Sequence, residues 1–309
     1  MTTEPRDETE VAIVTEPASE RPRGKPVSRG RQIRARLVQR PQFWAGAGLL
    51  VLIVLLALLG NMPNAHTFSS QDPYALMQPP SPQHWFGTDS IGQDVYARVI
   101  AGLQKSLIIG LLAGPLATII AAVLGSLAGY LGGAVEAVIS WFINLLLALP
   151  VFYVLLVVSP LLAKVSWTLL ILILAAFGWM VAAQVVKNMT KSLREREFVK
   201  AARFMGVSTW TTLGRHIIPN VASLLIIDAC LGVVGAILGE TALSYFGLGI
   251  QPPNVSLGTL LQDGQAAAVT SPWLFVFPAL CLVLLLTGVN LLGDALRDAI
   301  DPTSEVNRG

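Results

Sequence analysis

The stretch "LIIGLLAGPLATIIAAVLGSLAGYL", Leu107–Leu131, decides the fold because it runs for 25 residues without a charged side chain. A helix needs roughly 20 apolar residues to cross the ~30 Å hydrocarbon core of a bilayer. In lipid, backbone groups find hydrogen-bond partners only within helices or closed barrels, and a long continuous apolar run fits a helix. The stretch therefore predicts a membrane-spanning α-helix.

The whole chain follows this pattern. Its 309 residues have a mean hydropathy of +0.63, and 13% of them are charged, about half the share in soluble domains. The predicted spans are Phe43–Gly60, Leu107–Leu131, Ala137–Leu162, Trp167–Val186, Val221–Gly247 and Trp273–Gly293. The sequence thus predicts an all-α integral membrane protein with a six-span domain over residues 43–302. A disordered leader over 1–42 and a short tail over 303–309 are expected to flank it.

Basic residues predict the orientation. Residues 1–42 carry nine Lys and Arg, and the loop between the fourth and fifth predicted spans, about 187–219, carries seven. The loops at 61–101 and 248–272 carry one and none. Because basic residues accumulate on the cytoplasmic side, we expect both termini and the 187–219 loop to be cytoplasmic in a multi-pass protein of the plasma (inner) membrane.

The cytoplasmic loop contains a helical pattern of its own, "KAARFMGVSTWTTLGRHIIPN" over Lys200–Asn220. The apolar stripe of a first helix comprises Phe198, Ala201, Ala202 and Met205. The stripe of a second helix comprises Trp210, Leu213 and Ile217. Gly206 is expected to end the first helix, Ser208 to cap the second and Pro219 to close it. This helix–turn–helix suits a partner contact, and its pattern also suits an amphipathic helix resting on lipid.

Two acidic residues, Asp228 and Glu240, lie inside the fifth predicted span, where ionisable side chains are costly and often functional. Each is a candidate for lining or gating a translocation path, for binding a substrate amine, or for pairing with a neighbouring helix. The end of the sixth span has a polar face that comprises Asn290, Asp294, Arg297 and Asp298. That face suits ion pairs within the helix or with a cytoplasmic partner, or is a solvated helix end.

Several motifs of enzymes do not occur in the sequence. It has no GxxxxGK[ST], HExxH or GxSxG, so we expect neither an ATP hydrolase nor a metalloprotease or esterase. His66 and His84 each stand without a second ligand at metal-binding spacing, which predicts surface roles and no metal site. No cofactor and no nucleic-acid partner are expected for this chain.

Four stretches resemble one family of transport proteins. "KAARFMG", nine residues and "HIIP" are similar to the loop Glu-Ala-Ala, three residues, Gly, nine residues, Ile-x-Leu-Pro of permeases in binding-protein-dependent ABC importers. The matching positions are Ala201, Ala202, Gly206 and Pro219, whereas Lys200, His216 and Ile218 replace the family's Glu, Ile and Leu. The other similar stretches are "HWFGTDSIGQDVYARVIAG" (His84–Gly102), "ETALSYFGLGIQPPNVSLGTLL" (Glu240–Leu261) and "GVNLLGDALRDAIDP" (Gly288–Pro302).

The resemblance is to C-type permease subunits of dipeptide, oligopeptide or nickel importers (the DppC and OppC group), and it implies the type I ABC importer permease fold. It implies that the cytoplasmic loop couples to ATPases through Lys200, Ala201, Ala202, Gly206, His216 and Pro219. The implied partners are a second, B-type permease in a heterodimer, two ATP-binding subunits that use ATP and magnesium, an external solute-binding protein and membrane lipid.

The function implied is peptide transport by alternating access, with ATP hydrolysis on the separate chains, so this chain is not itself expected to be an enzyme. The alternatives are an importer subunit for nickel or another small solute, and a non-transporting membrane scaffold.

Overall fold

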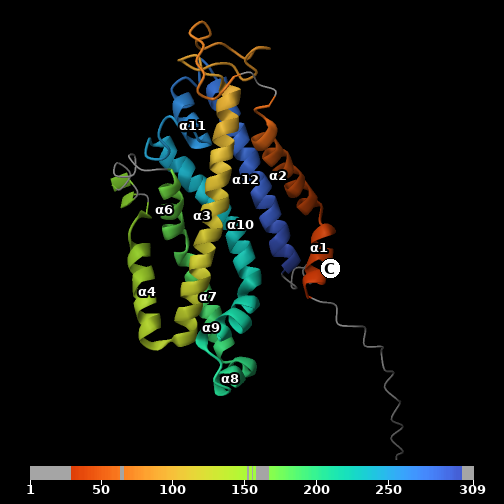
Figure 1. Cartoon of the computed structure of the whole chain (residues 1–309), viewed down its shortest axis with the longest axis vertical. Helices are drawn as coiled ribbons and strands as arrows, with labels where there is room; N and C mark the ends of the chain where they lie inside the picture. Colours follow the sequence, from red (N-terminus) through yellow and green to blue (C-terminus); the bar gives the residue numbers. More distant parts are fainter. Residues whose placement is uncertain (1–28, 63–65, 152, 155, 158–166, 301–309) are drawn as a thin grey trace, which may run out of the picture.

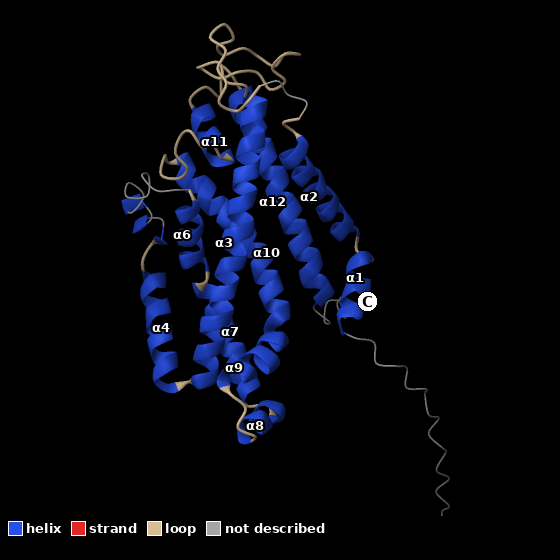
Figure 2. Ribbon diagram, in the orientation of Figure 1, coloured by secondary structure: helices blue, strands red, loops and turns tan. Residues whose placement is uncertain are grey.

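The computed structural model describes residues 29–62, 66–151, 153–154, 156–157 and 167–300. Its helices are α1 (Arg29–Val38), α2 (Pro41–Leu59), α3 (Val95–Leu131), α4 (Gly133–Ala148), α6 (Thr168–Gly178), α7 (Met180–Arg194), α8 (Glu197–Phe204), α9 (Thr209–Thr212), the π-helix η1 (Leu213–Ile217), α10 (Ile218–Tyr245), α11 (Leu257–Gln265) and α12 (Trp273–Ile300). Figure 2 shows these helices as one bundle with loops gathered at its ends. The prediction of an all-α protein is confirmed for the described residues.

Helix α3 is the central element of the bundle. Its 37 residues give a length of about 55 Å at ~1.5 Å per residue, well beyond the ~30 Å hydrocarbon core. It packs most extensively against α7 and α10, while α2 and α12 pack against each other (Figure 1). The long loop after α2 lies at one end of the bundle and α8 at the opposite end.

Four helical runs are long and apolar enough to cross a membrane: Pro41–Leu59, Val95–Leu131, Thr209–Tyr245 and Trp273–Ile300. Helices α6 and α7 qualify together as a fifth, although a 43° bend separates them. The third predicted span, Ala137–Leu162, begins in the 16-residue helix α4, and much of its remainder lies outside the described residues. The described residues thus contain four helical runs that could span a membrane, or five with the bent pair, and six spans stay a prediction.

Glycines allow α3 to approach its neighbours closely. A Cβ atom on Gly114 would lie 2.4 Å from the backbone nitrogen of Val233 in α10. A Cβ atom on Gly129 would lie 2.4 Å from the carbonyl oxygen of Lys187 in α7. Gly114 and Gly129 therefore let α3 approach α10 and α7 more closely than a larger residue would allow.

The range predicted as a disordered leader includes a helix. Residues 1–28 and 301–309 lie outside the described residues, but Arg29–Val38 form α1, which packs against α12. Arg40, at the start of α2, forms an ion pair with Asp298 near the end of α12. This contact holds the beginning of the described chain against its end.

Candidate functional site

Helix α8 forms the tip of the bundle at the end opposite the long loop that follows α2 (Figure 1). Acidic Glu197 in its first turn and basic Arg203 in its last both complement the helix dipole. At its end, the N–H of Val207 donates to the carbonyl of Ala202 (3.1 Å) and that of Gly206 to Arg203 (3.0 Å). Gly206 takes the left-handed φ of +74° that this Schellman motif requires, so the predicted stop is confirmed.

The inner face of α8 is anchored to the bundle. A buried cluster joins it to α3 and η1; it comprises Tyr130, Val199, Leu213 and Ile217. Ala202, 2% exposed, lies beside Val199 on the buried face. Of the predicted stripe, Phe198, Ala201 and Met205 are exposed and therefore accessible to a partner, whereas Ala202 is buried. The bundle covers the Val199–Ala202 side, where Val199 packs against the ends of α3 and η1.

The outer face of this segment exposes large apolar side chains. Phe204 is 90% exposed, Met205 75%, Trp210 66% and Phe198 44%. We call these four residues the tip surface. They lie on or directly after two short helices, α8 and α9, that contact each other, and so many exposed apolar side chains in one short segment indicate a surface that contacts another molecule.

The other loop residues singled out by the sequence lie around the tip surface. Lys200 is exposed and forms an ion pair with Glu195 at 3.2 Å. Hydrogen bonds from Lys200 and then Arg194 lower the pKa of the Glu195 carboxyl below its usual value. His216 is half-buried, with its ring centroid 6.2 Å from that of Phe198. The positive charge of Lys200 is thus partly compensated within the loop.

Pro219 does not close the second loop helix, contrary to the prediction. Ser208 caps α9 by accepting the N–H of Thr211, as expected. The chain then continues without a break through η1 into α10, in whose first turn Pro219 lies. A proline is tolerated at such a position, where its missing N–H and fixed φ disturb the helix least. The tip is therefore continuous with the fifth predicted span.

Asp228 pairs with a neighbouring helix. It is half-buried in α10 and accepts a 2.5 Å hydrogen bond from the hydroxyl of Thr118 in α3. The pair lies one turn from the point where Gly114 and Gly232 bring the two helices together. Its position fits a contact that fixes the rotation of α10 against α3.

Glu240 is fully buried at the meeting of α3, α10 and α11. Its carboxylate accepts hydrogen bonds from the hydroxyls of Ser244 (2.6 Å) and Ser106 (3.3 Å). Ser106 also accepts the backbone N–H of Leu257, the first residue of α11, and Ser244 accepts that of Ile250. One carboxylate thus organises the polar contacts of three helices and of the loop that joins α10 to α11.

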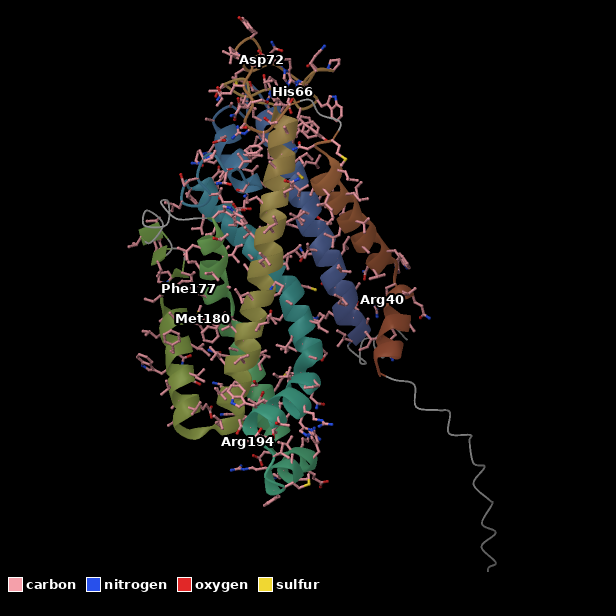
Figure 3. All side chains as sticks on the ribbon, in the orientation of Figure 1. Arg40, His66, Asp72, Phe177, Met180 and Arg194 are labelled. Carbon is pink, nitrogen blue, oxygen red and sulfur yellow. The ribbon has the colours of Figure 1, made fainter. Side chains whose placement is uncertain are left out.

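The polar residues at the end of α12 do not form one shared cluster. Asn290, Asp294 and Arg297 are exposed, which leaves them accessible to a partner or solvent. Asp298 is half-buried and pairs with Arg40 (labelled in Figure 3). The end of α12 therefore combines an accessible face with an internal ion pair.

The loop end of the bundle contains a cavity of about 650 Å³, lined by segments before α3 and around α11. Arg98 in its wall forms ion pairs with Asp89 (2.6 Å) and Asp263 (2.9 Å), which joins the long loop to α11. Neither Asp228 nor Glu240 is among the residues that line it. The cavity, whose wall combines apolar side chains with these ion pairs, is separate from the two acidic side chains singled out in the fifth span.

Sequence reasoning missed two features at this end. Lys105, just before the predicted second span, donates to Asn254 (3.2 Å) and lies 4.0 Å from the centroid of the Trp167 ring. A lysine so close to an apolar run is a signal that could have been noticed. His66 and His84, expected to have separate surface roles, stack with centroids 4.6 Å apart, and His84 is buried. No spacing rule could have shown that contact.

Comparisons with known proteins find two matching family descriptions and several named relatives. The family described as "Binding-protein-dependent transport system inner membrane component" matches residues 121–305, and "N-terminal TM domain of oligopeptide transport permease C" matches residues 28–80. The chain is 47% identical over 274 residues to the oligopeptide transport system permease protein OppC of Mycobacterium tuberculosis (strain H37Rv), covering 88% of this chain and 94% of that protein. It is 32% identical over 257 residues to OppC of Bacillus subtilis (strain 168), covering 83% and 84%.

Proposed function

The chain belongs to the family of binding-protein-dependent transport system inner membrane components, and from this premise we propose that it carries oligopeptides across the plasma membrane as one permease subunit of an ATP-driven importer. The observation that supports oligopeptides as the substrate is the 47% identity, over most of both chains, to a permease named for oligopeptide transport. A second permease, two ATP-binding subunits and an external solute-binding protein complete the proposed assembly, with ATP and magnesium on the ATP-binding subunits.

The tip surface supports a role in coupling to the ATP-binding subunits. Its apolar side chains lie in the loop where basic residues accumulate, which the positive-inside rule assigns to the cytoplasm. Covering such side chains stabilises a contact by about 25 cal/mol per Å² of apolar surface. We propose that Lys200, Ala201, Ala202, Gly206, His216 and Pro219 lie within or beside this contact, as in the coupling loop that the sequence resembles.

The anchoring of the tip supports transmission of motion to the spans. Val199 and Ala202 pack inward against the bundle, and η1 continues directly into α10. Closure of the ATP-binding subunits would move α8 and with it α3 and α10. Alternating access then follows if the two arrangements of the spans are close in free energy and partner binding selects between them.

The contacts of the acidic residues favour a gating or structural role over direct substrate binding. Asp228 and Glu240 both hydrogen-bond to hydroxyls of α3, so each joins α10 to α3 and neither lines the cavity. We propose six spans with both termini cytoplasmic, in which these bonds stabilise one arrangement of α3 and α10.

The experiment that tests the proposal starts from a tagged chain purified in mild detergent with its natural partners. Mass spectrometry of the eluate and an ATPase assay establish the assembly, and uptake of labelled oligopeptides into proteoliposomes with ATP on the cytoplasmic side establishes the activity. ATP-dependent peptide uptake supports the proposal. An active complex that takes up Ni²⁺ or another small solute but no peptide refutes the substrate class, and a chain that binds no ATPase supports a scaffold instead.

A further inference from the structure

Three side chains with metal-binding groups meet at the end of the bundle opposite the tip surface. They are His66, His84 and Asp94. One nitrogen of each imidazole and one carboxylate oxygen all lie within 4.8 Å of one another. His66, labelled in Figure 3, comes from the loop after α2, His84 from later in that loop and Asp94 from the N-cap of α3. Tertiary packing therefore creates a cluster that the sequence does not display.

Two of these ligands are held in place before any ion binds. His84 is 5% exposed and Asp94 2%, and Nδ1 of His84 lies 2.9 Å from Oδ2 of Asp94. The other oxygen of Asp94, Oδ1, accepts the N–H of Ala97 (2.8 Å) and so caps α3. The backbone N–H of His84 donates to the hydroxyl of Ser81, and its carbonyl accepts from the N–H of Gly87. A rigid pair of this kind reduces the entropy lost on binding an ion.

The third ligand is brought close by a contact between α2 and α3. The hydroxyl of Tyr96 in the first turn of α3 donates to the carbonyl of Gly60 (2.9 Å), just after the end of α2. The chain reaches His66 six residues later, and the His66 ring stacks on that of His84 at an interplanar angle of 29°. His66 is half-exposed, so the cluster is open to solvent on one side, which gives an ion a route of entry.

The donor set suits a divalent transition metal. Two imidazoles and a carboxylate bind Zn²⁺ at about 2.0–2.2 Å, which places the ligand atoms of a tetrahedral site about 3.4 Å apart. The spread of up to 4.8 Å here means that one ligand must move inward by about 1 Å, and His66 is the most exposed of the three. The 2.9 Å contact between Nδ1 of His84 and Oδ2 of Asp94 must open slightly, and an ion bound by these two atoms releases the proton they share to solvent. Imidazole also accepts Ni²⁺ and Cu²⁺, whereas Mg²⁺ and Ca²⁺ prefer oxygen ligands alone.

We propose that His66, His84 and Asp94 bind one divalent transition-metal cation of the Zn²⁺ class, with water in the remaining coordination position. The ion fastens the loop after α2 to the first turn of α3. It thereby stabilises the loop end of the bundle, where the cavity lined by Asp89 and Arg98 opens.

The test measures Zn²⁺ binding by the full chain, purified through a tag that contains no histidine and stripped of metal with a chelator. Titration against a fluorescent zinc chelator is expected to show one Zn²⁺ per chain. In His66→Gln the affinity should fall by at least about tenfold, since even the loss of an outer-shell partner costs 10–100-fold. Asp94→Asn should weaken binding likewise, while its amide oxygen can still cap α3.

The matched control is His216→Gln, which removes the remaining histidine of the chain at the opposite end of the bundle and should leave Zn²⁺ affinity unchanged. A second readout is the electron paramagnetic resonance spectrum of bound Cu²⁺, which should show two coordinating nitrogens in the wild type and one in His66→Gln. Absence of stoichiometric Zn²⁺ binding, or equal affinity in wild type and His66→Gln, would overturn the proposal. Either result would make His84 and Asp94 a metal-free pair that orders the start of α3.

Discussion

Ser106 and Glu240 meet across the contact between α3 and α10, where the serine hydroxyl donates to a carboxylate that is fully buried. Replacing Glu240 by Leu keeps the approximate volume but leaves the hydroxyls of Ser106 and Ser244 without their acceptor. Unsatisfied buried groups cost about 1–3 kcal/mol each, so we expect a clearly lower melting temperature of the detergent-purified chain. Asp294→Leu, the same change at an exposed position of α12, serves as control and should melt near the wild-type temperature.

The conformation of Gly206 predicts how substitutions there will act. At φ +74° a β-branched residue is strained, by at least the 1–2 kcal/mol typical of the left-handed region, although its Cβ would meet open space. We expect Gly206→Val to distort the end of α8 and to reduce ATP-dependent uptake while the spans still insert in the membrane. Gly206→Asn should retain most activity because Asn tolerates this conformation. Wild-type uptake by the Val variant would count against coupling through the tip.

The exposed side chains of the tip surface lead to a prediction about binding of the ATP-binding subunits. Phe204 is 90% exposed in the chain alone, so Phe204→Asp should leave the melting temperature of the isolated chain unchanged. If the ATP-binding subunits cover this residue, loss of a central aromatic contact is expected to cost about 2 kcal/mol or more, which weakens binding by more than about tenfold. The measurement is the amount of ATP-binding subunit that copurifies with the tagged chain.

The control for that experiment is Tyr74→Asp at the opposite end of the bundle. Tyr74 is 94% exposed, so the two variants introduce the same charge at positions of similar exposure. Tyr74→Asp should retain the ATP-binding subunits. Equal recovery of these subunits with Phe204→Asp and with the wild type would place the docking surface elsewhere.

The effect of replacing a glycine by valine should depend on what its Cβ atom would meet, as Gly129 in α3 and Gly235 in α10 illustrate. Gly129→Val would push a side chain against the backbone carbonyl of Lys187, and overpacking of this kind costs about 1–3 kcal/mol. We expect the variant to melt at lower temperature and to unfold faster in detergent. Gly235→Val makes the same change where a Cβ has open space and should have little effect on the isolated chain. Similar losses in both variants would mean that helix propensity, rather than close packing, determines the outcome.

Hydropathy was sufficient to locate most of the bundle. The apolar runs at Phe43–Gly60, Leu107–Leu131, Val221–Gly247 and Trp273–Gly293 correspond to α2, α3, α10 and α12. It did not reveal the 43° bend between α6 and α7, because hydropathy counts apolar residues and carries no information on direction. It also did not reveal that α3 begins at Val95, since that first part contains Arg98 and Lys105, whose charges are satisfied by contacts with distant residues.

Features of the candidate site that depend on neighbouring residues were predicted better than features that depend on tertiary contacts. Gly206 as a helix stop and Ser208 as a cap depend only on backbone geometry and neighbouring residues, and both are confirmed. The side of α8 that packs against the bundle, at Val199 and Ala202, was not predicted, because an apolar stripe does not show which side the rest of the protein covers. The approach of His66 to His84 depends on the contact between α2 and α3 and has no counterpart in the sequence pattern.

The length of α3 has a mechanical consequence. Its first turn carries Asp94 as cap and Tyr96 bonded to the end of α2, while its last turn supplies Tyr130 to the cluster beneath α8. A single rod of about 55 Å thus links both ends of the bundle. A tilt of about 5° around one end would displace the other by about 5 Å, roughly one helical turn. A rotation of a few degrees imposed at the α8 end would therefore become a displacement of several ångströms at the loop that follows α2.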